Sequence, residues 1–232
     1  MVVSDTAGAV LVHGLWHGAW CWDAVVAALE SRGIDTVAVE LPMTELADDI
    51  AATRAALDRF ARPAVLVGHS YGGAVITEAG AHPLVRELMY IAAYQLDSGE
   101  SISRTLPDRG LPDSRIGDAM RLDIESGEVS LDPALGPGLL YSDAHTTVAA
   151  RSTAKLRPVS RLLFRGVPQA ISWHRVPSTY VVCTADEVVH PELQRAMAGR
   201  ATYRVDWDGG HSPALTRPNT VADLIESRVR AL

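Results

Sequence analysis

The fold is decided by the stretch Gly68-His69-Ser70-Tyr71-Gly72. The apolar run Ala64-Val65-Leu66-Val67 precedes it, and a helix-like segment that begins at Gly73 follows it. The pattern G-x-S-x-G between a buried strand and a helix predicts a sharp turn that lifts the serine hydroxyl above the edge of a sheet. Glycines are needed on either side because a Cβ there would collide with the neighbouring strand or helix. The pattern therefore predicts that Ser70 is a nucleophile.

Length, composition and charge are those of one globular domain. A chain of 232 residues with 47% apolar residues is long enough for a single substantial core. The formal net charge is −7 and there is no long basic run, which argues against nucleic acid and anionic membrane surfaces as partners. No apolar run approaches the roughly 20 residues of a membrane span. Together with two isolated cysteines, Cys21 and Cys183, these features predict a cytoplasmic protein with no membrane partner.

Short apolar runs alternate with segments of helical periodicity, of which the clearest cover residues 22–29 and 46–60. Nearly continuous apolar strands separated by helices imply a parallel sheet that is covered on both faces. The predicted fold class is therefore α/β, with a mostly parallel sheet of six strands flanked by helices. The strands are expected at residues 10–12, 36–39, 64–67, 88–93, 179–183 and 202–207.

The pattern changes between Asp97 and about Trp173. This segment is richer in Pro, Gly, Ser and charged residues, and its helical stretches are short, such as residues 143–156. A loop of that length without structure of its own is improbable in a compact domain. We therefore expect residues 97–173 to form a helical cap inserted into a core of residues 1–96 and 174–232. The cap is expected to lie over the carboxyl ends of the strands, where α/β sheets place their sites.

A nucleophilic serine needs a histidine that removes its proton and an acid that orients the histidine. Of the eight histidines, His211 stands out because the stretch Asp208-Gly209-Gly210-His211-Ser212-Pro213 follows the last predicted strand. The chain order Ser…Asp…His is typical of α/β folds that deliver the base from this loop. His211 is therefore predicted to be the base, with a structural loop histidine as the alternative.

The orienting acid is expected directly after the preceding strand. There, Thr184-Ala185-Asp186-Glu187 follows the apolar run that ends at Cys183. Asp186 is the predicted acid and Glu187 is the alternative. Two other carboxylates, Asp206 and Asp208, belong to the strand that already leads to the base, so they are expected to be solvated surface groups.

The third requirement is an oxyanion hole, made of two backbone N–H groups that point at the developing negative charge. One donor is expected to be Tyr71, because free amides at a helix N-terminus favour an anion. The other is expected in the turn His13-Gly14-Leu15-Trp16-His17-Gly18, with the Leu15 N–H as the candidate. The side chains of Leu15, Trp16 and Tyr71, together with the cap, are predicted to bind the substrate in a largely apolar pocket.

Four stretches of the chain resemble the α/β-hydrolase superfamily. They are His13-Gly14-Leu15-Trp16-His17-Gly18-Ala19-Trp20, Gly68-His69-Ser70-Tyr71-Gly72-Gly73, Val182-Cys183-Thr184-Ala185-Asp186 and Gly210-His211. More narrowly, the chain is similar to the group of plant methyl-ester esterases, salicylate-binding esterases and hydroxynitrile lyases, with its bacterial esterase relatives. The resemblance implies Ser70, Asp186 and His211 as a catalytic triad. It also implies Leu15 and Tyr71 as oxyanion donors, no cofactor or metal, and frequently a homodimer.

Differences from neighbouring members of the superfamily narrow the expected reaction. The lyases resemble one another in having a threonine where this chain has Gly14 and a lysine where it has Ser212. Epoxide hydrolases and dehalogenases of this fold have an aspartate at the position of Ser70. The resemblance therefore favours an ester hydrolase over these enzymes.

The expected function is a cofactor-independent serine hydrolase that cleaves a small or aromatic carboxylic ester through an acyl-enzyme on Ser70. A lactonase, a thioesterase, a carbon–carbon hydrolase or a hydroxynitrile-lyase-like enzyme would use the same machinery. A small-molecule receptor with a retained triad is the alternative from another class. The expected partner is a small-molecule ester.

Overall fold

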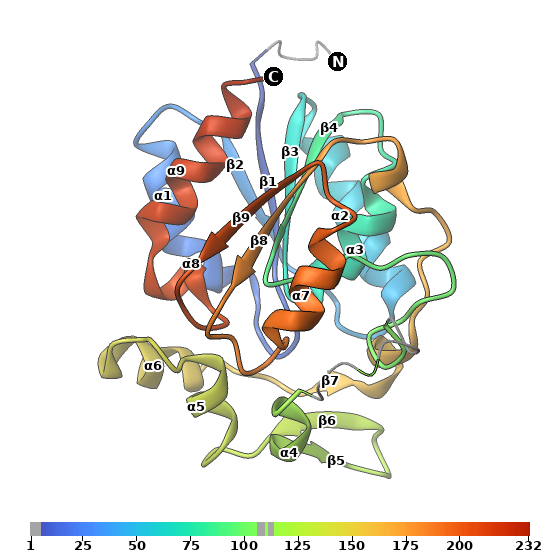
Figure 1. The fold of residues 1–232 in the computed structure, drawn as a ribbon, viewed down its shortest axis with the longest axis vertical. Coiled ribbons are helices and arrows are strands. Elements are labelled where there is room, and N and C mark those ends of the chain that lie inside the picture. The colour runs from blue at the N-terminus through green and yellow to red at the C-terminus, as the bar shows by residue number, and fades with distance from the viewer. Residues whose placement is uncertain (1–5, 106–109, 111–113) are drawn as a thin grey trace.

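A six-stranded sheet forms the centre of the protein (Figure 1). The computed structural model describes residues 6–105, 110 and 114–232. The strands of the sheet are β1 (Gly8–Val12), β2 (Thr36–Val39), β3 (Ala64–His69), β4 (Val85–Ile91), β8 (Ser178–Cys183) and β9 (Tyr203–Trp207). Their order across the sheet is β2-β1-β3-β4-β8-β9, and every neighbouring pair is parallel. All the carboxyl ends therefore point toward one edge, the lower edge in Figure 1.

The predicted fold class is confirmed, and the expected strands agree with the observed ones to within three residues at each end. The agreement has a physical cause, because β1, β3 and β8 are buried along their whole length and need apolar residues on both faces. At the edge of the sheet, β9 is mostly exposed.

Helices cover both faces of the sheet (Figure 1). The helices of this core are α1 (Asp23–Glu30), α2 (Leu46–Phe60), α3 (Gly72–Ala79), α7 (Pro191–Ala198), α8 (Pro213–Thr216) and α9 (Pro218–Val229), with the 3₁₀ helix η1 (Ala19–Trp22). One face carries α1 packed on α9, and the other carries α2 packed on α3. No helix in the described part of the chain combines the length and the apolar character that crossing a membrane requires.

Two apolar clusters fill the spaces between the sheet and its helices. Alternation along β1 sends Leu11 to the cluster under α1 and α9, and sends Val10 to the cluster under α2 and α3. The second cluster continues past the strand ends and includes Val129, Leu140 and Leu163 from the inserted segment. One hydrophobic core therefore joins the sheet to this insertion.

Most of the insertion between β4 and β8 lies beyond the carboxyl edge of the sheet, and its last part runs back beside α3 (Figure 1). It contains α4 (Ile116–Ala119), α5 (Gly136–Leu140), α6 (Thr146–Thr153), β5 (Met120–Leu122), β6 (Glu128–Leu131), β7 (Val159–Ser160), η2 (Arg161–Arg165) and η3 (Ser172–His174). The sequence predicted helices here, and the antiparallel sheet β5-β6-β7 is an addition. Its strands are too short and too exposed to leave an alternating apolar pattern. Residues 106–109 and 111–113 of the expected cap lie outside the described residues.

Candidate active site

Ser70 occupies a sharp turn between β3 and α3. Its φ of 54° lies in the left-handed region, which residues with a side chain rarely adopt. Backbone hydrogen bonds hold this conformation from both sides. The Ser70 N–H donates to the Ile91 carbonyl at 3.2 Å, and the Tyr94 N–H donates to the Ser70 carbonyl at 3.0 Å. The end of β4 therefore fixes the strained serine.

The glycines around Ser70 are required by close backbone approaches. A Cβ on Gly68 would lie 2.6 Å from the Gly72 carbonyl oxygen, and a Cβ on Gly72 would lie 2.5 Å from the Val12 carbonyl oxygen. A Cβ on Gly73 would lie 2.8 Å from the Tyr94 nitrogen. This crowding is the physical reason for the glycine pattern from which the elbow was predicted.

His211 and Asp186 form a buried pair. His211 Nδ1 lies 2.8 Å from Asp186 Oδ2, and the two residues are 1% and 3% exposed. A carboxylate can only accept a hydrogen bond, so Nδ1 of the histidine carries the proton. Nε2 of His211 is then the basic nitrogen, which is the arrangement that a general base requires.

The Asp186 carboxylate is fully satisfied by hydrogen bonds. Oδ1 accepts from the Val188 and Val189 N–H groups at 2.7 and 3.0 Å, and Oδ2 accepts from Gln194 Nε2 at 2.8 Å. Gln194 is fully buried on α7, and the sequence did not identify it. The sequence feature that could have pointed to Gln194 is a glutamine on the apolar face of a helix.

The other candidate acids point elsewhere. Glu187 forms an ion pair with Arg115, and the Asp206 carboxylate pairs with Arg204 at 2.6 Å. Asp208 is exposed. Among these four carboxylates, the structure therefore brings Asp186 to His211 and leaves the others at the surface.

Two histidines near the site are buried and neutral. His17 Nδ1 donates to the Leu15 carbonyl at 2.9 Å, and its Nε2 accepts from the Tyr141 hydroxyl at 2.9 Å. Burial lowers the pKa of His17 to about 4. Burial likewise lowers the pKa of His13 to about 3, and its Nε2 accepts from the Leu41 N–H at 3.1 Å. The basic nitrogen of each ring is occupied, which leaves neither free to act as a base.

His69 links the nucleophile elbow to the candidate base. Its Nε2 donates to the His211 carbonyl oxygen at 2.7 Å, and the two rings are 4.7 Å apart. Burial lowers the pKa of His69 well below its usual value, so the ring is neutral with its proton on Nε2. The residue next to Ser70 is thus bonded directly to the residue expected to activate it.

The turn after β1 lies against the nucleophile. A Cβ on Gly14 would be 2.8 Å from Ser70 Cβ and 3.3 Å from Ser70 Oγ. Within the described residues, the N–H groups of Leu15 and Tyr71 have no hydrogen-bond partner. These are the two amides that the sequence predicted as oxyanion donors, and Tyr71 stands at the start of α3.

Of the three predicted substrate-binding side chains, two lie toward the insertion and one lies toward α2. Leu15 and Trp16 are buried in the cluster that joins the sheet to the insertion. Trp16 also lines a cavity of about 160 Å³ bordered by the insertion. The Tyr71 side chain is fully buried, and its hydroxyl donates to Asp49 Oδ2 on α2 at 2.6 Å. Burial raises the pKa of Asp49 to about 6.

The insertion binds the turn after β1 at several points that the sequence did not reveal. Trp16 Nε1 donates to the Val129 carbonyl at 3.0 Å, and the Arg157 N–H donates to the Trp16 carbonyl at 3.0 Å. The Arg157 side chain donates to the carbonyls of His17 and Leu41 at 3.1 and 2.9 Å. These contacts join residues more than 100 positions apart, so no local pattern signals them.

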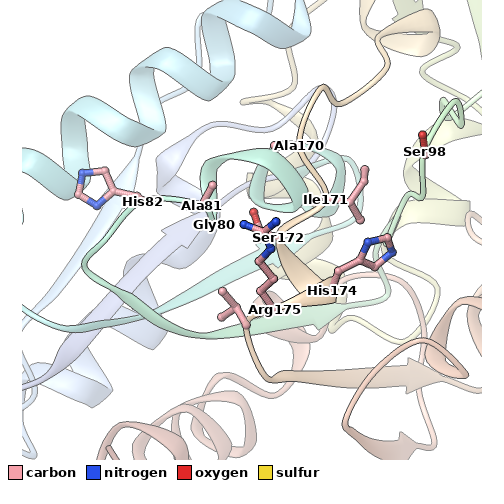
Figure 2. Close-up of a pocket in the computed structure, with 10 residues that line it drawn as sticks. Gly80, Ala81, His82, Ser98, Ala170, Ile171, Ser172, His174 and Arg175 are labelled. Atoms are coloured by element: carbon pink, nitrogen blue, oxygen red, sulfur yellow. The ribbon is translucent and has the colours of Figure 1, made fainter.

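A larger cavity of about 520 Å³ lies away from these residues (Figure 2). Figure 2 shows Gly80 and Ala81 at the end of α3, facing His174 and Arg175 from the segment around η3. None of the predicted site residues lines it. Among the described residues, no group of three or more His, Cys, Asp or Glu side chains is arranged to hold a metal ion.

The fold agrees with what comparison with known proteins finds. A family model described as "Alpha/beta hydrolase family" matches residues 9–224, and the chain therefore belongs to the α/β hydrolase family. The α/β hydrolase nvfD of Aspergillus novofumigatus is 29% identical over 94% of both chains. Methylesterase 17 of Arabidopsis thaliana is 25% identical over 93% of this chain and 89% of its own.

Solved structures show the same fold. A pyrethroid hydrolase from Sphingobium faniae JZ-2 superposes with a TM-score of 0.83 at 22% identity, covering 98% of each chain. The predicted family and fold are thereby confirmed. Family membership and the methylesterase relative support the predicted enzyme class, a carboxylic-ester hydrolase.

Proposed function

We propose that this protein is a cofactor-independent serine hydrolase that cleaves a small or aromatic carboxylic ester through an acyl-enzyme on Ser70. One observation carries the proposal. The strained Ser70, at φ 54°, directly follows His69, which is bonded to His211, while His211 Nδ1 is 2.8 Å from Asp186. The turn that carries Ser70 is therefore joined through His69 to the His211–Asp186 pair, and this arrangement supports the proposed triad.

Acylation begins when Ser70 Oγ attacks the ester carbonyl and transfers its proton to Nε2 of His211. The negative charge that develops on the carbonyl oxygen is stabilised by the N–H groups of Leu15 and Tyr71. Asp186 stabilises the imidazolium that forms and remains ionised itself. His211 then protonates the leaving alcohol, which departs and leaves the acyl group on Ser70.

Deacylation uses the same groups with water as the nucleophile. Nε2 of His211 removes a proton from water, which attacks the acyl carbonyl, and the same two amides stabilise the second oxyanion. Collapse of this intermediate releases the carboxylic acid and returns the proton to Ser70. The cycle is balanced because ester and water give acid and alcohol.

Apolar surroundings support a small or aromatic substrate. Residues 97–173 act in this proposal as a cap over the core of residues 1–96 and 174–232. Leu15 and Trp16 belong to the same buried cluster as cap residues such as Leu140. A relative that covers nearly the whole chain is named a methylesterase, which fits a small ester. The homodimer and the cytoplasmic location expected from the sequence stay predictions.

The lyase alternative has less support from this backbone. A side chain at position 14 would place its Cβ 2.8 Å from Ser70 Cβ, so the turn would have to shift to admit a threonine. Ser212 is 2% exposed and offers no cation for a departing cyanide. Both observations favour ester hydrolysis.

The test is hydrolysis of p-nitrophenyl acetate, butyrate and octanoate by the wild type, Ser70→Ala and Ser227→Ala. Ser227 is an exposed serine of α9 and serves as the matched control. We expect turnover by the wild type and the control, and a loss of several orders of magnitude in kcat for Ser70→Ala. Retention of most activity by Ser70→Ala would overturn the proposal. Negligible wild-type turnover, with a ligand-induced rise in Tm, would favour the receptor instead.

A further inference from the structure

The histidine loop, residues Asp208–His211, is held by main-chain hydrogen bonds from several elements. Arg217 Nη1 donates to the Asp208 carbonyl at 2.5 Å, and the Ala185 N–H donates to the Gly209 carbonyl at 3.0 Å. His69 holds the His211 carbonyl, as described above. These three partners all belong to the α/β core.

The fourth partner comes from the insertion. The Gly210 N–H donates to Asp143 Oδ2 at 3.0 Å, and Asp143 lies in the loop between α5 and α6. The same carboxylate oxygen forms an ion pair with Arg217 Nη2 at 3.1 Å. One carboxylate of the insertion thus binds both the peptide next to His211 and the arginine that holds the start of the loop.

The Gly209-Gly210 pair provides the space for this carboxylate. A Cβ on Gly210 would lie 2.5 Å from Ser142 Oγ and 2.9 Å from Asp143 Oδ1. A Cβ on Gly209 would lie 2.7 Å from Cζ of Arg217 and 3.0 Å from Asp143 Oδ2. The proposed reaction by itself needs no glycine at either position. The insertion approaches Gly210 closely, whereas Gly209 is crowded first by the Arg217 side chain that pairs with Asp143.

We propose that Asp143 is a positioning residue that holds the Gly210 peptide and thereby sets the orientation of His211. The inference rests on the proposed function, in which His211 is the base. The ion pair alone would contribute little to stability, because the Asp143 and Arg217 side chains are 25% and 32% exposed. The hydrogen bond to Gly210 matters more, because a misplacement of about 1 Å in a catalytic group costs about 100-fold in rate.

The experiment compares Asp143→Ala with the control Asp132→Ala. Asp132 is also an aspartate of the insertion, is also 25% exposed, and pairs with Arg121 at 2.8 Å, but it has no bond to the histidine loop. For Asp143→Ala we expect kcat to fall about 10- to 100-fold while KM stays within about twofold. Asp132→Ala should keep the wild-type kcat, and Tm should fall by similar amounts in the two variants.

A conservative replacement of Asp143 distinguishes a role in positioning His211 from a role in merely attaching the insertion to the core. Asp143→Asn keeps an oxygen that can accept from the Gly210 N–H and loses the charge that pairs with Arg217. We expect it to recover most of the kcat lost in Asp143→Ala. A kcat for Asp143→Ala equal to that of Asp132→Ala would overturn the proposal.

A second variant tests the same contact from the other side. Gly210→Ala displaces the Asp143 carboxylate without removing it, and remains informative if Asp143→Ala does not fold. We expect a similar loss of kcat, and a double variant that is no worse than the poorer single variant. Losses that add independently would contradict the shared contact.

Ser70→Ala in the same assay keeps the two proposals distinguishable. If Ser70→Ala remains active, the proposed function fails. If Ser70→Ala is inactive while Asp143→Ala behaves like the wild type, only the positioning role fails. The rate at which a small fluorophosphonate labels Ser70 gives a second readout of base position. We expect Asp143→Ala to be labelled about 10-fold or more slowly than Asp132→Ala.

Discussion

The nucleophile elbow and the histidine loop are held in different ways, although both serve the same proposed reaction. Backbone partners of Ser70 are Gly73, Ile91 and Tyr94, all of which belong to the core, and close glycine contacts within the core complete the elbow. The histidine loop takes one of its partners, Asp143, from the insertion. The position of the nucleophile is therefore set by the sheet, whereas the position of the base also depends on the insertion.

The turn after β1 resembles the histidine loop in this respect. Trp16 donates to Val129 of β6, and His17 accepts from Tyr141 beyond α5. Two of the three parts of the proposed machinery thus touch the segment expected to contact substrate. Changes in the insertion can therefore alter specificity and rate while the elbow stays intact.

The largest effect is expected when His211 loses its side-chain partner in the core. Asp186→Asn keeps the shape of the acid but can no longer enforce the proton on Nδ1 of His211, so kcat should fall about 10⁴-fold. Asp206→Asn, which removes an exposed carboxylate paired with Arg204, is the control and should leave kcat unchanged. Steady-state kinetics with p-nitrophenyl butyrate measure both. A loss below tenfold for Asp186→Asn would contradict the assignment of the acid.

An intermediate effect is expected when His17, which contacts the insertion, is replaced. The free energy of unfolding should then depend less on pH. Burial lowers the pKa of His17 from 6.5 to about 4, so between these values the unfolded chain binds more protons than the folded chain. The free energy of unfolding should therefore fall as the pH falls from 6.5 toward 4, by up to about 3 kcal/mol from this residue.

Urea unfolding of the wild type and His17→Gln at pH 7, 6, 5 and 4 measures this contribution. Other groups titrate in the same window, including His13, whose pKa burial also lowers. The difference between the two proteins isolates His17, and we expect the variant to show the weaker pH dependence. Parallel curves for the two proteins would show that His17 is not held neutral in the folded state.

The smallest effect is expected at the hydrogen bond between the turn and β6. Trp16→Phe removes the donor to Val129, and kcat/KM should fall by no more than about 10-fold. Trp173→Phe removes an equivalent bond, from Nε1 to the Leu96 carbonyl at 2.8 Å, and should leave kcat/KM unchanged. Both variants should lose about 1 kcal/mol of stability. Equal losses of kcat/KM in the two variants would show that the hydrogen bond between the turn and β6 affects catalysis no more than the bond between Trp173 and Leu96.

The strands of the sheet could be predicted because each one is marked by a short stretch of consecutive residues. Fully buried parallel strands need continuous apolar runs, and in such α/β folds the reactive groups follow the strand ends. Ser70, Asp186 and His211 were therefore predicted from their places after β3, β8 and β9. Glu187 was a close alternative in sequence, and the structure separates the two residues because Asp186 binds His211 while Glu187 pairs with Arg115 at the surface.

The supporting contacts could not be predicted because they depend on how the insertion folds back. Asp143 and Gly210 are 67 residues apart, and His69 and the His211 carbonyl are 142 apart. Gln194 lies eight residues from Asp186, but its role depends on the turn between β8 and α7. The Gly209-Gly210 pair was visible in the sequence, but the physical reason for these glycines appears only in the structure, where Arg217 crowds Gly209 and the insertion crowds Gly210.

The central claim is that Ser70 carries the acyl group. The most direct measurement is mass spectrometry of the protein quenched during turnover of p-nitrophenyl butyrate, followed by peptide mapping. We expect a butyryl adduct on the peptide that contains Ser70, accumulating in the wild type and missing in Ser70→Ala. Turnover without any adduct on this peptide, or an adduct on another residue that persists in Ser70→Ala, would contradict the claim.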